Sequence, residues 1–125
     1  MDNAVVQELQ QEFPEQFAKD GTPCWSTLPK GWQHLCREVM QKVKEHGVQL
    51  KWAQLKEKFG GLRMYEDLAD GTSPNDLYDW IHEAEQKSWH VCQECGSGGA
   101  GTKQRVIHNW RLTLCNHCAK LRAAH

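Results

Sequence analysis

Two Cys-x-x-Cys pairs near the C-terminal end of the sequence constrain the fold more than any other feature. Cys92 and Cys95 form the first pair, and Cys115 and Cys118 form the second after nineteen intervening residues. Two thiolates three positions apart can hold one metal ion from a single tight turn, and two such turns complete a tetrahedral set. Gly96 permits the turn after the first pair. The sequence therefore predicts one structural Zn²⁺ ion bound by these four cysteines.

Three histidines near the pairs leave the ligand set open. His90 and His125 flank the segment, and either can replace a cysteine as a ligand. His117 lies between two ligands, where a side chain usually points away from the ion. Four thiolates already close a zinc site and leave no position for water, which favours a structural site over a catalytic one.

Length and composition predict one cytoplasmic domain. The 125 residues suit a single core, and we expect residues 90–125 to form a zinc-binding subdomain packed on residues 1–89. No apolar run is long enough for a membrane span, and the first residues lack the order of a signal peptide. Because cytoplasmic thiols stay reduced, six cysteines indicate metal binding rather than disulfides. Cys24 is interpreted as a loop thiol and Cys36 as a small core residue.

The net charge of −1 hides an asymmetry along the chain. Residues 1–94 have a net charge of −6, whereas residues 95–125 contain five basic residues and no acid. Four thiolates around Zn²⁺ carry a net charge of about −2, which leaves the C-terminal segment at about +3. That is less basic than a dedicated DNA-binding domain.

Apolar spacing predicts three helices. The first is short and ends near Phe13, and a turn or second short helix follows. The second begins at Trp32 and ends at Gly47. Its apolar stripe consists of Trp32, Leu35, Cys36, Val39, Met40 and Val43. The third is expected to begin with Ser73 as its cap and Pro74 at its first position. Its inner face consists of Leu77, Ile81, Ala84 and Ser88.

Residues 48–68 predict a β-hairpin that turns at Gly60-Gly61, a pair that permits the positive φ angles of a two-residue turn. This register places Phe59 opposite Leu62, Lys58 opposite Arg63, and Lys56 opposite Tyr65. One face, suited to burial, holds Leu55, Phe59, Leu62 and Met64. The other face holds Lys56, Lys58, Arg63 and Tyr65, with Trp52 further along the same strand.

The polar face of this hairpin is the predicted partner-binding surface. Like charges opposite one another, as Lys58 and Arg63 would be, destabilise a sheet unless an anion screens them. Arg63 can bind a carboxylate or phosphate through two parallel hydrogen bonds, and Tyr65 adds a surface for stacking. Lys56 would contribute a third positive charge. A solvated strand face explains the same residues and stays the alternative.

The C-terminal segment resembles a treble-clef zinc finger. A knuckle (CQECG) precedes a glycine-rich loop, two β-like runs (TKQRVIHN and WRLTL) and a second cysteine pair that opens a helix. GATA-type fingers share the Leu-Cys-Asn-x-Cys signature, but their DNA-binding tail is not matched in the seven residues after Cys118. HNH nucleases are built on the same finger, and His108 would then be the candidate catalytic histidine. No acid lies near it to complete that site.

The sequence also resembles a family of small bacterial and phage proteins with a zinc-finger segment. The matching motifs are Gly31-Trp32, the run LKEKFGGLRMY (residues 55–65), the helix end EAEQKS (residues 83–88) and the second cysteine pair. The resemblance covers most of residues 31–118. It implies a phage or mobile-element origin but no particular activity.

Together these features predict an α+β fold with amphipathic helices, a two-stranded hairpin and a C-terminal treble-clef-like zinc knot. The leading hypothesis for function is a non-enzymatic phage or mobile-element protein that binds a macromolecule, such as a protein or nucleoprotein complex of host defence (anti-CRISPR-like). A nucleic-acid-binding regulator is the alternative, and an HNH-like nuclease is a third hypothesis. We assign no catalytic residue, and we expect no association with membranes.

Overall fold

The computed structural model describes residues 4–18, 27–68 and 75–124. In chain order the elements are α1 (Ala4–Glu12), η1 (Pro14–Gln16), η2 (Lys30–Trp32), α2 (Gln33–Glu45), β1 (Leu50–Lys58), β2 (Gly61–Leu68), α3 (Asn75–Ser88), β3 (Lys103–Ile107), β4 (Trp110–Leu114) and α4 (Asn116–Ala123). The strands form two separate antiparallel hairpins, β1–β2 and β3–β4. Helices and antiparallel sheets in these proportions confirm the α+β prediction. Within the described ranges, no helix is long and apolar enough to cross a membrane.

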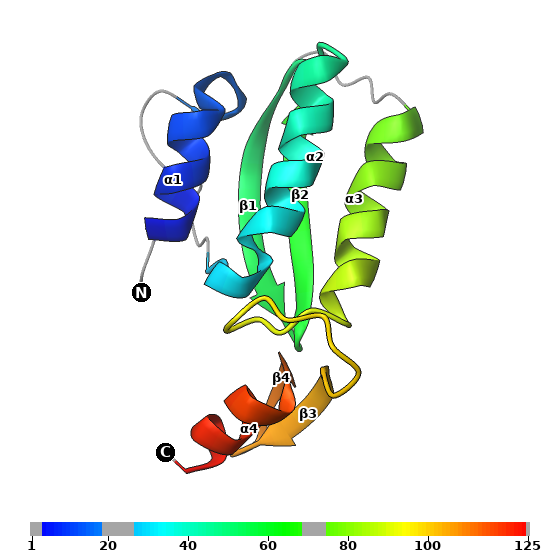
Figure 1. Ribbon diagram of the computed structural model, residues 1–125. Coiled ribbons are helices and arrows are strands. Elements are labelled where there is room, and N and C mark those ends of the chain that lie inside the picture. Colours follow the sequence, from blue (N-terminus) through cyan, green and yellow to red (C-terminus); the bar gives the residue numbers. More distant parts are fainter. Residues whose placement is uncertain (1–3, 19–26, 69–74, 125) are drawn as a thin grey trace.

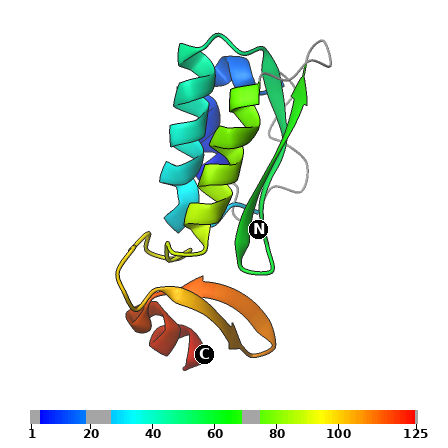
Figure 2. The same ribbon diagram turned by 90° about the vertical axis from the view of Figure 1, so that its right-hand side faces the viewer.

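Helices α1, α2 and α3 cover one face of the β1–β2 hairpin, and the β3–β4 hairpin with α4 lies beyond the hairpin tip (Figures 1 and 2). The main core fills the space between these helices and the hairpin. Five hairpin side chains enter it: Leu50, Trp52, Leu55, Leu62 and Met64. A second, smaller core surrounds the cysteines, where Leu112 and Leu114 of β4 are buried.

The apolar stripes predicted for α2 and α3 both face the main core. The six residues of the first stripe, Trp32 at the end of η2 and five in α2, are at most 2% exposed, and the four of α3 are at most 6% exposed. Helix α2 ends where Gly47 takes a φ of +66°, a left-handed conformation that glycine adopts without strain. The predicted cap of α3, Ser73 and Pro74, lies outside the described residues, as does Cys24.

The predicted turn of the first hairpin is wrong by one residue, and each predicted partner is therefore wrong by two. Phe59 and Gly60 are the two turn residues, with φ of 54° and 82°, and Lys58 pairs with Gly61. As a result Lys56, rather than Lys58, lies opposite Arg63. The shift takes Phe59 out of the strand, so its side chain, which was predicted to be buried, is 63% exposed.

Gly61 is a strand residue, and its small size serves packing rather than the turn. A Cβ at this position would lie 2.8 Å from the indole ring of Trp89, which follows α3. Glycine is therefore required at these two consecutive positions for different structural reasons. Gly60 supplies a left-handed turn conformation, and Gly61 lets the end of α3 approach the hairpin. The sequence alone does not separate these two demands, which explains the error in register.

The predicted position of Trp52 on the polar face is also wrong. Its side chain is 3% exposed and belongs to the main core. The pairing shifts by one residue between Trp52 and Gln54, so Ala53 is an extra residue in β1. Such a bulge reverses which residues face the core on either side of it. The buried indole N–H donates to Oε1 of Gln16, 2.9 Å away, which satisfies its hydrogen bond.

Candidate metal centre and an adjoining cleft

The four predicted cysteine ligands come together. The sulfur atoms of Cys92, Cys95, Cys115 and Cys118 all lie within 4.8 Å of one another. The Cys95 and Cys115 sulfurs are 3.7 Å apart. Four thiolates at about 2.3 Å from one tetrahedral ion would be about 3.8 Å apart, so the cluster has the dimensions of a zinc or similar tetrahedral site. These four residues can therefore hold a metal ion.

The first cysteine pair sits in a turn fixed by backbone hydrogen bonds. The Gly96 N–H donates to the carbonyl of Cys92, and the Cys92 N–H donates to the carbonyl of Ser97, both over 2.8 Å. Gly96 has a φ of 82°, as expected for a residue that closes such a knuckle. Cys92 is fully buried, whereas Cys95 is exposed. The knuckle thus places two sulfur atoms in the cluster, that of Cys92 on its buried side and that of Cys95 on its exposed side.

The second cysteine pair belongs to the start of α4. Cys115 is the N-cap residue of this helix, and its sulfur accepts the N–H of Cys118 over 3.4 Å. That hydrogen bond, against opposing burial, lowers the pKa of Cys115 to about 7. Burial raises the pKa of the Cys118 thiol, and hydrogen bonding to Cys115 adds to this effect. A bound cation would favour the thiolate form of both cysteines.

The histidines weighed as alternative ligands are not part of the cluster. Among the described residues, the only group of metal-ligating side chains with suitable geometry consists of the four cysteines. It includes neither His90 nor His117, and His125 lies outside the described residues. His108 is exposed in the β3–β4 turn, and it is not in the cluster either. Cys36 lies in the main core, where burial raises the pKa of its thiol.

The metal segment contacts the helical part first through the η2 turn. The Gly31 N–H donates to the carbonyl of Gln93 over 2.9 Å. The indole N–H of Trp32, the next residue, donates to the carbonyl of Val91 over 2.8 Å. Both acceptors flank Cys92, so the end of η2 and the first knuckle are held together.

A second contact joins the tip of the β1–β2 hairpin to the β3–β4 sheet. The hydroxyl of Thr113 donates to the carbonyl of Gly60, and the side-chain amide of Gln104 donates to the carbonyl of Phe59, each over 2.6 Å. Gln104 and Thr113 are cross-strand partners on one face of the sheet. Two turn carbonyls are thus bound by the segment that carries the cysteines.

The four residues predicted to bind a partner share one face of the β1–β2 hairpin despite the corrected register. Lys56 pairs with Arg63, and Tyr65 pairs with Gln54, so all project away from the buried Leu55–Met64 pair. The Lys56 ammonium lies 5.5 Å from the Tyr65 ring centroid. In the part of the chain that the structure describes, none of Lys56, Lys58 or Arg63 forms an ion pair with an acid.

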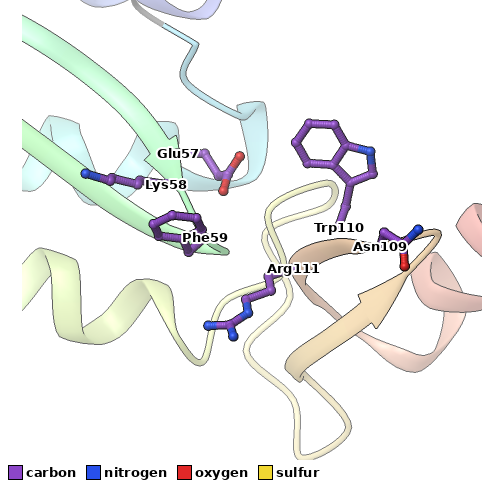
Figure 3. A pocket seen from close by; sticks show the side chains of 6 residues that line it. All are labelled: Glu57, Lys58, Phe59, Asn109, Trp110 and Arg111. Atoms are coloured by element: carbon purple, nitrogen blue, oxygen red, sulfur yellow. The ribbon is translucent and has the colours of Figure 1, made fainter.

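A cleft beside the hairpin tip escaped the sequence analysis. It has a volume of about 510 Å³, and its lining residues come from both hairpins: Glu57, Lys58, Phe59, Asn109, Trp110 and Arg111 (Figure 3). Phe59 and Trp110 are 63% and 67% exposed. The cleft exists because the two turns meet, and this long-range contact leaves no signature in the sequence. In the sequence, only the polar pair His108-Asn109 before Trp110 indicates a turn at this place.

No protein-family model, curated protein or solved structure matches this chain.

Proposed function

We propose that this chain is a non-enzymatic zinc protein in which one Zn²⁺ ion, held by Cys92, Cys95, Cys115 and Cys118, stabilises a surface that binds a macromolecule. The observation that supports this most strongly is the approach of four sulfurs to within 4.8 Å of one another. Sulfur ligands in tetrahedral arrangement are typical of structural zinc.

The role proposed for the ion is mechanical. Four protein ligands would fill the coordination sphere and leave no place for a reacting water, so the site suits scaffolding better than hydrolysis. The contacts from the cysteine segment to Gly31 and to the turn at Gly60 support this role, because they tie the ligand-bearing segment to the rest of the fold. Residues 90–125 would then act as a zinc-dependent subdomain docked on residues 1–89.

The proposed partner surface is the exposed face of the β1–β2 hairpin, with Lys56, Lys58, Arg63 and Tyr65. Support comes from the direct cross-strand pairing of Lys56 with Arg63, two like charges that an anionic partner would relieve. The narrower hypothesis of a phage protein that inhibits a host defence complex is supported by sequence resemblance alone.

The test of the scaffold is metal content measured together with stability. We expect about one zinc per purified chain, and a Cys95→Ser variant should lose both the metal and a large part of the melting temperature. Cys36→Ser is the matched control, since Cys36 lies outside the cluster and should keep the metal. Zinc well below one per chain, or a Cys95→Ser variant that melts like the parent, would refute the proposal.

A further inference from the structure

Two tight turns face one another across the cleft, and both contain residues in the left-handed region. The described residues include three non-glycine positions with positive φ, namely Phe59 at 54°, His108 at 53° and Asn109 at 70°. His108 and Asn109 connect β3 to β4, and Phe59 begins the turn between β1 and β2. Strained backbone of this kind is retained where the surroundings hold it and where the position has a use.

Phe59 is the most informative of the three. Asn or Asp is the preferred first residue of such a turn, and an aromatic residue there is strained. Burial of the ring does not offset the free energy of this strain, because Phe59 is 63% exposed. The strained backbone is held in place by the amide of Gln104, which donates to the Phe59 carbonyl over 2.6 Å. An aromatic ring is thus kept at the surface, in a position that the second hairpin fixes.

The charges around this ring are positive in balance. The Lys58 ammonium lies 5.8 Å from the centroid of the Phe59 ring, and Arg111 lines the same cleft. Neither cation forms an ion pair among the described residues. The one acid in the lining, Glu57, already accepts the Gly60 N–H over 2.7 Å. That hydrogen bond leaves the carboxylate charged, so an anionic ligand would meet two cations and one acid in the lining, a positive balance of one charge.

The second aromatic residue stands on the opposite side of the cleft. Trp110 projects from the start of β4, across from Phe59 and the hairpin tip, with Asn109 beside it (Figure 3). Its indole is 67% exposed, so it too contributes little to the core. The cleft thus combines two flat apolar faces, two cations and a side-chain amide. Stacking surfaces bordered by cations are the means by which proteins hold unpaired bases and their phosphates.

We propose that this cleft binds single-stranded nucleic acid, with bases stacked on Phe59 and Trp110 and phosphates held by Lys58 and Arg111. The strand would continue onto the basic face of β1–β2, where Lys56 and Arg63 lie. A duplex fits less well because its bases are already stacked on one another and cannot lie on the two rings. Carboxylates of an acidic protein would satisfy the cations, but they offer no aromatic face to stack on the two rings. This inference rests on the proposed function, since the cleft adjoins the proposed partner surface, shares Lys58 with it and would bind the same partner.

The test is fluorescence anisotropy with a labelled single strand of roughly 16 nucleotides, in DNA and RNA versions, using the zinc-loaded full chain. Phe59→Asn removes the ring and supplies the residue that the turn prefers, and Trp110→Ala removes the second ring. Each should weaken binding about 5- to 100-fold. The Lys58→Ala, Arg111→Ala double variant should reduce the slope of log affinity against log salt by about 1.4.

Two remote variants serve as controls. Tyr78→Ala removes an aromatic residue of α3 that is 54% exposed, and Lys44→Ala removes an exposed cation of α2. Both should bind like the parent. A difference between the DNA and RNA strands would show which of the two sugars the cleft selects, and either result supports the proposal.

Several outcomes would overturn the proposal. These are no binding of single strands by the parent, equal binding of the matching duplex with no effect of the ring variants, or binding of a poly-glutamate peptide in place of the oligonucleotides. Zinc content and melting temperature are measured on the same samples. A chain that holds its zinc and melts normally, yet binds no strand, refutes this inference and leaves the zinc scaffold intact. A chain that binds strands without zinc refutes the scaffold instead.

Discussion

Gly31 and Gln93 are joined so closely that the first has no room for a side chain. The Gly31 N–H donates to the Gln93 carbonyl over 2.9 Å. A Cβ at Gly31 would lie 2.6 Å from that oxygen and would overlap the carbonyl oxygen of Cys92. The backbone of η2 therefore lies directly on the knuckle that carries two of the four cysteines. The position of the proposed zinc site relative to the helices depends on this contact.

Replacing Gly31 with alanine should separate these two segments. Because the obstructing atoms are backbone, they cannot move aside cheaply, and we expect a loss of about 3 kcal/mol in the free energy of unfolding. Gly47→Ala is the matched control: Gly47 has a φ of +66° and no atom within 4 Å of an added Cβ, so only backbone strain of about 1 kcal/mol is expected. Chemical denaturation measures both. Equal losses for the two variants would mean that the Gly31 contact is not made.

Phe59→Asn should leave the protein as stable as the parent or more stable. Asn followed by Gly60 suits a turn with two left-handed residues, so a gain of up to about 1 kcal/mol is expected. Had Phe59 been a core residue, as the sequence suggested, its removal would cost about 3–5 kcal/mol. Thermal unfolding separates these results. A large loss of stability would restore the original register.

Thr113→Val should weaken the contact between the two hairpins. The Thr113 hydroxyl is fully buried and donates to the Gly60 carbonyl over 2.6 Å, so valine leaves that carbonyl without its donor. We expect a loss of about 2 kcal/mol. Thr113→Ser keeps the hydroxyl and should lose less than half as much. If Thr113→Val unfolds like the parent in denaturant titrations while Thr113→Ser loses stability, packing of the methyl group matters and the hydrogen bond does not.

The ion pair between α1 and α2 gives a dependence on pH. Arg37 binds the Glu12 carboxylate through two short hydrogen bonds, of 2.8 and 2.7 Å, and these lower the pKa of Glu12. A carboxyl with a lowered pKa contributes stability above its unfolded value and loses it as the pH falls through the folded value. The difference in melting temperature between the parent and Arg37→Gln should therefore shrink below about pH 4. A difference that stays constant through this range would contradict the role of the carboxylate. Lys44→Gln is the control and should show no such change.

The sequence predicted well where spacing alone determines structure. The stripe of α2 repeats every three or four residues, and the Cys-x-x-Cys pairs set the reach of each knuckle, so both follow from local geometry. Prediction from the sequence failed where a contact between distant residues determines the local structure. Gly61 is small because Trp89 lies against it, and Ala53 is a bulge that brings Trp52 into the core. Phe59 is in a turn because the second hairpin binds its carbonyl. No local pattern encodes these three relationships.

The most direct test of the proposed zinc site is X-ray absorption at the zinc edge on the purified, metal-loaded protein. The account predicts a single shell of four sulfur atoms at about 2.3 Å, with no nitrogen or oxygen ligand. Cys95→Ser, if it retains any zinc, should lose one sulfur from that shell. A parent spectrum with a histidine nitrogen or a water oxygen in the first shell would contradict the closed site of Cys92, Cys95, Cys115 and Cys118. Such a ligand would also contradict the proposal that the ion has a purely structural role.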